Sequence, residues 1–406
     1  MNSLEQVIGR DAAGRHSLPA RLFLQMLAGL RHGSLRLQTP DAETLVFNGA
    51  ASGPAADLAL RDWGVCAELL RGGDVAFADA YIEGRWESGN LSALLQLAAV
   101  NERALEQAIH GRWWMRALLS LRHALNANTR RGSRRNIEAH YDLGNDFFRL
   151  WLDPGMTYSA AVFAGDSHLS LEQAQQLKYE RILERLGAKP GDRILEIGCG
   201  WGGFAEHAAG SRGCRVHGIT LSPSQLASAR ERIARRGLGH LVTLELRDYR
   251  DLEGRYDHVV SIEMFEAVGE RWWSTYFDRV AALLAPGGRA VVQVITIAGA
   301  HFRRYRQGSD FIQQRVFPGG MLPSPDAFTR HANCAALRVE NAYAFGLDYA
   351  ETLRHWERSF QERAAEVREL GFDERFMRLW RFYLAYCEAG FRSGRTDVYQ
   401  FELAHA

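Results

Sequence analysis

The chain has 406 residues, of which 47% are hydrophobic and 24% are charged, and its formal net charge is +1. At roughly 100 to 200 residues per domain, this length predicts two or three domains with ample cores and excludes a small disulfide-stapled scaffold. The composition excludes a disordered or collagen-like chain. The near-neutral charge excludes the global basic field of a general nucleic-acid binder.

Lysine and cysteine usage narrows the chemistry further. Only Lys178 and Lys189 are lysines, which disfavours Schiff-base chemistry and a Walker A loop, because that loop requires a G-K-[ST] sequence. The five cysteines are widely spread and form no C-x-x-C pair and no compact Cys/His cluster. This pattern predicts reduced thiols in a cytoplasmic protein and no metal site.

The N-terminal part, residues 1–106, alternates short apolar segments with glycine-rich turns. Residues 33–40 and 43–53 are typical of strands and hairpin turns, and residues 60–73 are typical of a helix. We therefore expect a small α+β accessory domain. The first residues lack the apolar core of a secretory signal, and no apolar run reaches the ~18 residues of a membrane-spanning helix.

Residues 107–137 form a basic linker or helix. From Ala108 to Ile137 the sequence has no acid, but it has seven arginines and two neighbouring tryptophans. Three interpretations stay open: an amphipathic helix on a membrane surface, a solvated linker helix, and a nucleic-acid patch. No stacking motif or recognition module accompanies the charge, so nucleic acid is disfavoured. Residues 303–306 (RRYR) are a second candidate for membrane contact.

From residue 138 to residue 406, strands and helices alternate, which predicts a mostly parallel sheet flanked by helices, a Rossmann-like α/β fold. Strands are expected within 193–200, 214–221, 241–248, 256–263 and 289–297, and helices within 201–213 and 274–286. A further helix should begin after Ser222 and end near Gly237, because Ser222 is followed by a proline and, three residues on, by a glutamine.

A glycine turn follows the first strand of this region. Gly198, Gly200 and Gly203 satisfy G-x-G-x-x-G between a strand and a helix, where glycine permits close approach of a ligand to the backbone. A nicotinamide dinucleotide also needs an acid or an arginine at the end of the second strand. Residues 218–222 (GITLS) offer neither, so a nicotinamide cofactor is disfavoured.

The surrounding pattern fits another nucleoside. Glu196 precedes the glycine turn, Asp248 ends a later strand, a strand ends near residues 263–266, and LLAPGGR (283–289) precedes the next strand. Together these features resemble class I methyltransferases that bind S-adenosylmethionine. That ligand has no phosphates, so the glycines would chiefly let its adenosyl and methionine portions approach the backbone.

Eight motifs carry a more specific resemblance. They are EAHYDLGNDFF (138–148), MTYSAAVF (156–163), LEIGCGWGGFA (195–205), GITLSPSQ (218–225), RDYRDL (247–252), SIEMFEAVG (261–269), FIQQRVFPGGMLPS (311–324) and FGLDYAETL (345–353). With these motifs the chain resembles the cyclopropane-fatty-acyl-phospholipid synthase family over about residues 136–402. Residues 1–106 are similar to the family's accessory domain, which is compared with sterol-carrier-like lipid-binding folds.

The resemblance implies an S-adenosylmethionine-dependent methyltransferase that transfers a methylene group to the double bond of an unsaturated acyl chain in a membrane phospholipid, giving a cyclopropane fatty acid. An alkene is a weak nucleophile, so the donor methyl must be held in line with the π bond in a dry pocket. A base must then remove a proton from the resulting carbocation. Family members are thought to hold a bicarbonate ion for this step.

The residues that would grip bicarbonate are only partly retained. The resemblance assigns this role to Glu266, the backbone of Ile295, and Tyr349, whereas the family's Cys and His positions are occupied by Ala160 and Gln293. Two interpretations follow: a bicarbonate held more loosely with help from the Gln293 amide, or Glu266 itself as the base with a raised pKa. Either way a methylene- or methyl-branched chain becomes an alternative product.

The resemblance and the glycine turn also predict the residues that contact S-adenosylmethionine. These are Tyr158, Ser159, Gly198, Gly200, Thr220, Leu221, Gln225 and Asp248. Tyr158 and Ser159 match the motif that closes over the cofactor. Thr220 and Gln225 would replace the missing ribose-binding acid. Glu263 competes with Glu266 for the catalytic role, and only the M-F-E register favours the latter.

The expected partners follow from this substrate. We expect an unsaturated phospholipid and a peripheral contact with the inner face of the membrane, with no nucleic acid, and a homodimer is left open. Two other functions remain: methylation of a soluble small molecule, and a non-catalytic lipid-binding protein that kept the fold after losing the Cys and the His.

Overall fold

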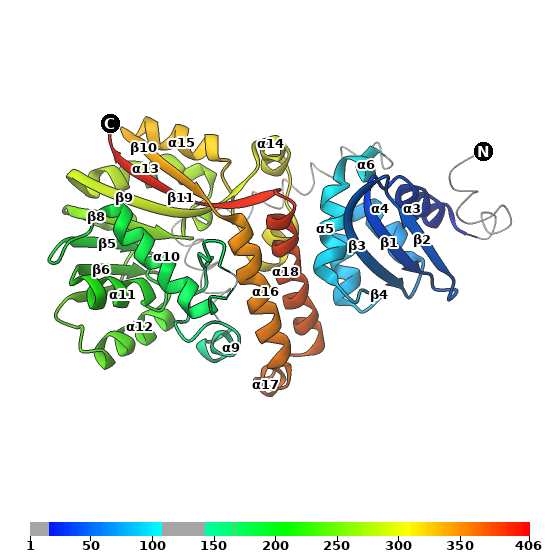
Figure 1. Cartoon of the computed structure of the whole chain (residues 1–406), viewed down its shortest axis with the longest axis horizontal. Coiled ribbons are helices and arrows are strands. Elements are labelled where there is room, and N and C mark those ends of the chain that lie inside the picture. Colours follow the sequence, from blue (N-terminus) through cyan, green and yellow to red (C-terminus); the bar gives the residue numbers. More distant parts are fainter. Residues whose placement is uncertain (1–15, 108–142, 167) are drawn as a thin grey trace.

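The computed structural model describes residues 16–107, 143–166 and 168–406, which form a smaller N-terminal unit and a larger unit beside it (Figure 1). The N-terminal unit contains a four-stranded sheet and the larger unit a seven-stranded sheet. The predicted basic segment, from residue 108 onward, and the beginning of the first family motif lie outside the described residues.

The N-terminal unit has the predicted α+β architecture. Its elements are α3 (Leu18–Ala28), β1 (His32–Gln38), β2 (Thr44–Asn48), β3 (Ala51–Leu60), α4 (Gly64–Ile82), β4 (Trp86–Glu87), α5 (Leu91–Val100) and α6 (Glu102–Gln107). The strand order is β2-β1-β3-β4, with β1 and β3 parallel. Leu35 and Leu37 alternate with exposed residues along β1 and contribute to the core with Phe23 of α3.

The larger unit contains the predicted mostly parallel sheet. Its strands are β5 (Arg193–Ile197), β6 (Arg215–Thr220), β7 (Val242–Leu246), β8 (Tyr256–Ile262), β9 (Leu284–Ile297), β10 (Leu337–Ala344) and β11 (Thr396–His405). They are ordered β10-β11-β9-β8-β5-β6-β7. The pairs from β9 to β7 are parallel, and β11 is antiparallel to both of its neighbours. This arrangement confirms the predicted Rossmann-like class.

Helices cover both faces of this sheet. The helices of the larger unit are α9 (Asn145–Arg149), α10 (Leu171–Leu186), α11 (Gly203–Arg212), α12 (Pro223–Arg235), α13 (Trp273–Leu283), α14 (Gly299–Gln307), α15 (Pro325–Cys334), α16 (Gly346–Glu362), α17 (Ala364–Glu369) and α18 (Glu374–Arg392). Neighbouring strand residues point to opposite faces. Val260 therefore joins the core beneath α10, α11 and α12, and Val259 joins the core beneath α13 and α15. Among the described helices, none is both long and apolar enough to cross a bilayer.

The helix α12 begins and ends as the sequence predicts. The Ser222 hydroxyl accepts a hydrogen bond from the backbone N–H of Gln225 at 3.3 Å, and Pro223 occupies the first turn. Gly237 has a φ of +68° just beyond the last turn. The cap therefore fixes the position of the Gln225 side chain, close to the end of β6.

Two predicted boundaries are wrong. The helix α13 ends at Leu283 instead of running to residue 286, and β9 begins at Leu284 instead of at residue 289. Leu284 pairs with Tyr256 of β8 and Arg289 pairs with His258, so the Pro-Gly-Gly residues between them form an irregularity in the strand, with Gly287 at a φ of +77°. The segment α4 is interrupted at Gly73, whose φ of +63° and ψ of −144° are not helical. The predicted end of the helix near residue 73 is therefore confirmed, and a second helical stretch continues to Ile82.

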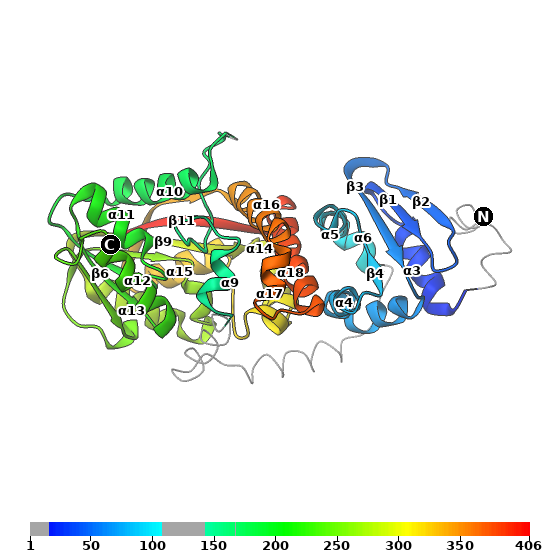
Figure 2. The same ribbon diagram turned by 90° about the horizontal axis from the view of Figure 1, so that it is seen from below.

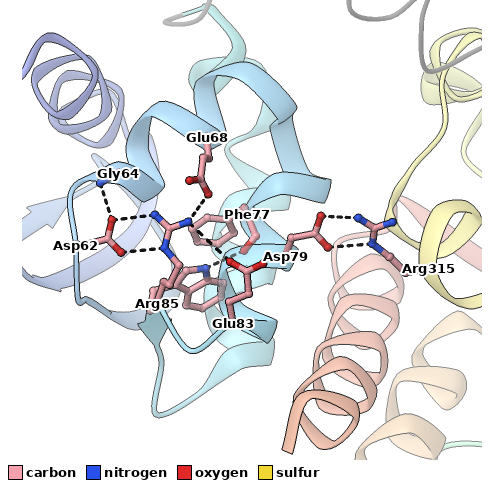
Figure 3. A network of polar contacts seen from close by, with 9 residues as sticks. Asp62, Gly64, Glu68, Phe77, Asp79, Glu83, Arg85 and Arg315 are labelled. Atoms are coloured by element: carbon pink, nitrogen blue, oxygen red, sulfur yellow. Dashed lines mark hydrogen bonds and ion pairs between the residues drawn. The ribbon is translucent and has the colours of Figure 1, made fainter.

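The helices α16 and α18 lie between the seven-stranded sheet and the N-terminal unit (Figures 1 and 2), where α18 contacts α4 and α5. Arg378 of α18 donates hydrogen bonds to the backbone oxygens of Tyr81 at 2.5 Å and Trp86 at 3.2 Å, and its guanidinium pairs with Glu87 at 2.7 Å. Arg315 and Asp79 form a second, bidentate pair across the junction (Figure 3). The two units are therefore joined by charge-assisted contacts as well as by helix packing.

Candidate active site

A cavity of about 1130 Å³ runs from the carboxyl ends of β5 and β6 through the junction and into the N-terminal unit. Its lining includes every residue predicted to contact the cofactor, together with Glu266, Ile295 and Tyr349. Gln293 is fully buried and lies behind this lining. The far end is apolar and is lined by Phe23, Leu27, Leu35, Leu58 and Leu97.

The glycine turn forms the near end of the cavity. Gly198 has a φ of +90° and Gly200 a φ of +50°, a region of backbone conformation that favours glycine. A Cβ atom added to Gly198 would lie 3.0 Å from the Cβ of Met264. The turn is held against β6, because the N–H groups of Gly198 and Cys199 donate to the carbonyl of Ile219 at 3.0 and 2.9 Å. The missing Cβ atoms leave the backbone open to a ligand in the cavity.

The residues after β6 and β7 carry polar groups into the same end. The Thr220 hydroxyl donates to the amide oxygen of Gln225 at 3.2 Å, so these two predicted cofactor contacts form one unit. The Asp248 carboxylate accepts hydrogen bonds from the backbone N–H of Arg250 at 3.0 Å and from its guanidinium at 2.6 Å. Asp248 is therefore held in a fixed orientation at the edge of the cavity.

The segment of residues 156–160 crosses the cavity opposite the glycine turn. The hydroxyl groups of Tyr158 and Tyr383 are 2.8 Å apart, and the Tyr158 ring packs against Trp151 and Trp356. Ser159 is buried, and its hydroxyl accepts a hydrogen bond from Lys178 of α10. An aromatic wall and a buried polar anchor therefore fix this segment.

Glu196 gives an independent indication of a polar ligand. It is buried, and its Oε2 atom has no hydrogen-bond partner among the described residues. Burial raises the pKa of Glu196 to about 8. An unpartnered buried carboxyl beside an open glycine turn fits the hydroxyl and ammonium donors of S-adenosylmethionine, because such donors would satisfy it. The residues present therefore fit this cofactor.

The Glu263 carboxylate accepts three hydrogen bonds from neutral donors. Its Oε1 atom accepts from the backbone N–H of Ala160 at 2.8 Å and from the Gln293 amide at 2.7 Å, and its Oε2 atom accepts from the Tyr349 hydroxyl at 2.7 Å. Glu263 has a φ of +50°, an uncommon conformation for a residue with a Cβ atom. This turn after β8 carries the side chain into the cavity.

Glu266 lies beside it with fewer partners. Its Oε1 atom accepts from the backbone N–H of Ile295 at 2.6 Å, and its Oε2 atom has no partner among the described residues. Burial and the charge of Glu263 raise the pKa of Glu266 to about 8. Burial also raises the pKa of Glu263, but hydrogen bonds from Tyr349, Ala160 and Gln293 oppose this effect. The two carboxyls titrate as a coupled pair, and the donors favour Glu263 as its ionised member.

Gln293 is oriented by the neighbouring strand. Gln293 of β9 and Gln400 of β11 face each other in the antiparallel register, and the Gln400 amide donates to the Gln293 amide oxygen at 3.1 Å. This bond assigns the Gln293 NH2 group to Glu263 and to the carbonyl oxygen of Ala160, 3.4 Å away. Gln293 therefore acts as a fixed, non-titrating donor.

The residues present do not fit a bicarbonate ion. The resemblance implies that residues 160, 266, 293, 295 and 349 would bind this ion. However, the donors of residues 160, 293 and 349 bind the Glu263 carboxylate. The remaining donor, the Ile295 N–H, binds Glu266. Because carboxylates of the chain itself occupy these donors, the donors are not available to bind a bicarbonate ion.

The structure brings the predicted site residues together around this cavity, but two further residues were not predicted as part of the site. Glu263 appeared in the sequence only as a competitor of Glu266, and its central place depends on the backbone turn after β8. Lys178 is fully buried below residues 157–160. In the sequence, only composition singles out Lys178, because it is one of only two lysines in the chain.

Comparisons with known proteins agree with this geometry. The family model described as mycolic acid cyclopropane synthetase matches residues 128–401. Tuberculostearic acid methyltransferase UfaA1 of Mycobacterium tuberculosis is 40% identical over 382 residues, covering 92% of this chain and 88% of that protein. Cyclopropane-fatty-acyl-phospholipid synthase of Escherichia coli is 32% identical over 356 residues, covering 88% of this chain and 89% of that protein.

A solved structure agrees with the fold. The crystal structure of mycolic acid cyclopropane synthase CmaA1 complexed with SAH and CTAB aligns with a TM-score of 0.62 and 31% identity, covering 66% of this chain and 97% of that chain. The alignment extends the sequence match to the three-dimensional arrangement of the larger unit. The chain therefore belongs to the mycolic acid cyclopropane synthetase family and is an S-adenosylmethionine-dependent methyltransferase of the cyclopropane synthase type.

Proposed function

We propose that the protein transfers a methyl group from S-adenosylmethionine to the double bond of an unsaturated acyl chain in a phospholipid, and that Glu263 removes the proton that completes the reaction. The observation that carries this proposal is the Glu263 carboxylate held by Ala160, Gln293 and Tyr349. A carboxylate fixed by three donors in a buried cavity is a positioned general base.

The cofactor would be held at the near end of the cavity. We assign its binding to the backbone of Gly198 and Gly200 and to the side chains of Tyr158, Ser159, Thr220, Gln225 and Asp248, with the Leu221 backbone beside them; these residues line that end together. When bound, S-adenosylmethionine supplies an electrophilic methyl carbon. The apolar walls exclude water from the acyl chain, which protects the carbocation that the transfer leaves on it.

Glu263 would take one proton from the transferred carbon. The electron pair of the broken C–H bond then closes a new bond, either to the cationic carbon, which gives a cyclopropane, or within a C=C bond after a hydride shift, which gives a methylene branch. Each product gains one CH2 in total. In both cases the accepting carboxylate must lie beside the transferred carbon, so one base position serves either outcome.

The methylene branch is the product that we favour. The Cys and His assigned to the anion site of cyclopropane synthases are replaced here by Ala160 and Gln293. In addition, a relative that is 40% identical over 92% of the chain is named as a methyltransferase and not as a cyclopropane synthase. A saturated methyl branch would require a later two-electron reduction, which is a separate reaction. Cyclopropane closure is the second candidate, supported by the description of the matching family.

The shape of the cavity supports a lipid substrate. Apolar side chains of the N-terminal unit line one end and the glycine turn lines the other, while charged and polar groups, including Asp74, Asp310 and Arg395, line the junction between them. The apolar end of the cavity fits the acyl chains of a lipid. We propose that the N-terminal unit is a lipid-binding accessory domain and that the protein works at the cytoplasmic membrane surface, where this substrate lies.

The test is to incubate the protein with S-adenosylmethionine and vesicles of matched unsaturated or saturated phospholipid. We expect a mass increase of one CH2 per modified chain with the unsaturated lipid only. Proton NMR of the product separates a cyclopropane from an exocyclic methylene. Turnover of a soluble compound without vesicles, and unmodified acyl chains, would contradict the proposal.

A further inference from the structure

Lys178 is a buried cation that forms no ion pair with any of the described residues. It lies on α10 with no exposed surface, and among the described residues its ammonium makes one hydrogen bond, to the Ser159 hydroxyl at 2.7 Å. Burial of an unpaired ammonium is costly, and here it lowers the pKa of Lys178 to about 7. A lysine kept in such a place, in a chain with only two lysines, calls for a physical reason.

The contacts of α10 lead directly to the proposed base. Gln175 and Lys178 lie one turn apart, and they bind the carbonyl oxygen of Ser159 at 2.8 Å and its hydroxyl at 2.7 Å. The next residue, Ala160, donates its N–H to Glu263 at 2.8 Å. The helix therefore fixes the peptide that delivers one of the three hydrogen bonds to the base.

The charges around Lys178 are mostly negative. The carboxyls that act on it are Glu263, Asp153 and Glu196, and the ammonium also lies 4.7 Å from the centre of the Tyr179 ring. Around Glu263 itself, Tyr349 and Gln293 are neutral donors, Glu266 is the neighbouring acid, and Lys178 is the cation that lowers its pKa.

We propose that Lys178 is a positioning residue for proton removal: it anchors Ser159 so that the N–H of Ala160 faces Glu263, and its charge keeps the Glu263 carboxylate ionised. This inference rests on the role of Glu263 in the proposed function. It goes beyond that role by assigning the control of the base to a residue that does not line the cavity.

Two variants separate the charge from the hydrogen bond. Lys178→Met and Gln175→Leu each remove one hydrogen bond to residue 159 from the same face of α10, and only the first removes a charge. Without the cation the pKa of Glu263 rises, because the Lys178 charge is one of the groups that lower it. The acid limb of kcat/KM against pH should therefore move upward in Lys178→Met and should stay in place in Gln175→Leu.

A second measurement needs no turnover. Infrared difference spectra record the C=O band of a protonated carboxyl, and the Glu263→Gln variant identifies the band of residue 263. In Lys178→Met this band should persist to higher pH than in the unmodified protein, and Lys178→Gln should reproduce the shift if the Met variant fails to fold. Equal titration of residue 263 in all folded variants would overturn the inference. Absent turnover with a shifted band would overturn the proposed function alone.

Discussion

At the scale of residues, the central feature is a carboxylate that the chain provides for itself. The sequence allowed Glu266, Ile295, Tyr349 and Gln293 to be placed by register with known motifs, and the structure gathers all of them within one site. The role of Glu263 was not predictable, because it depends on a left-handed backbone at φ +50°. Because of this turn, the three donors bind Glu263 instead of Glu266.

The first prediction concerns bicarbonate. Because Glu263 binds the donors of Ala160, Gln293 and Tyr349, we expect initial rates in carbonate-free buffer to equal those with added bicarbonate. The measurement is the rate of S-adenosylhomocysteine formation with unsaturated vesicles, with the pH held constant. A rate that falls on depletion and recovers on addition would show that an external anion is the base.

The second prediction compares the two glutamates. Glu263→Gln keeps the side-chain shape but cannot accept the proton, so we expect kcat to fall by about 10²- to 10⁴-fold. Glu266→Gln can still accept from the Ile295 N–H and resembles a protonated carboxyl, so we expect less than about a tenfold loss. Cofactor affinity, measured by calorimetry, should stay nearly unchanged in both. A larger loss in Glu266→Gln than in Glu263→Gln would reverse the assignment.

At the scale of elements, local pattern predicted the strands and helices that build the cofactor end. Continuous apolar runs and a complete capping sequence identify β5, β6 and α12 without knowledge of the fold. The start of β9 was missed, because Leu284 pairs with Tyr256 ahead of the Pro-Gly-Gly residues, which remain as an irregularity inside the strand. Such pairing is a long-range interaction that a sequence window does not contain.

A third prediction tests the glycine turn. Gly198→Ala places a Cβ atom 3.0 Å from Met264 and strains a backbone at φ +90°, so we expect a loss of about 1–2 kcal/mol of unfolding free energy and weaker cofactor binding. Gly237→Ala is the matched control, because its φ is +68° and nothing lies within 4 Å of the added atom. Calorimetry should show an unchanged Kd in the control. Equal affinity loss in both variants would mean that backbone strain, not the cavity, decides binding.

At the scale of the whole molecule, length and composition predicted two or three domains but not how they meet. The junction joins residues far apart in the sequence, as in the pair of Arg378 with Glu87 and the pair of Arg395 with Glu102. The cavity crosses this junction, so the catalytic end and the apolar end depend on its integrity. No local pattern marks either arginine among the 49 basic residues.

A fourth prediction ranks the contacts at the junction. Arg378→Ala removes three hydrogen bonds across the junction, to the backbone oxygens of Tyr81 and Trp86 and to Glu87, so we expect a loss of about 2–3 kcal/mol and faster proteolysis between the units. Asp79→Asn removes the charge from a partly exposed pair and should cost less than about 1 kcal/mol. Thermal unfolding and timed proteolysis measure both. Similar losses in the two variants would contradict the ranking.

The measurement that tests the account most directly uses S-adenosylmethionine carrying a fully deuterated methyl group, with vesicles of an unsaturated phospholipid. Proton removal from the transferred carbon predicts an acyl product that keeps two of the three deuterium atoms. In the Glu263→Gln variant this product should form about 10²- to 10⁴-fold more slowly. An acyl product that keeps all three deuterium atoms, or labelled product that forms at an unchanged rate in Glu263→Gln, would contradict the account.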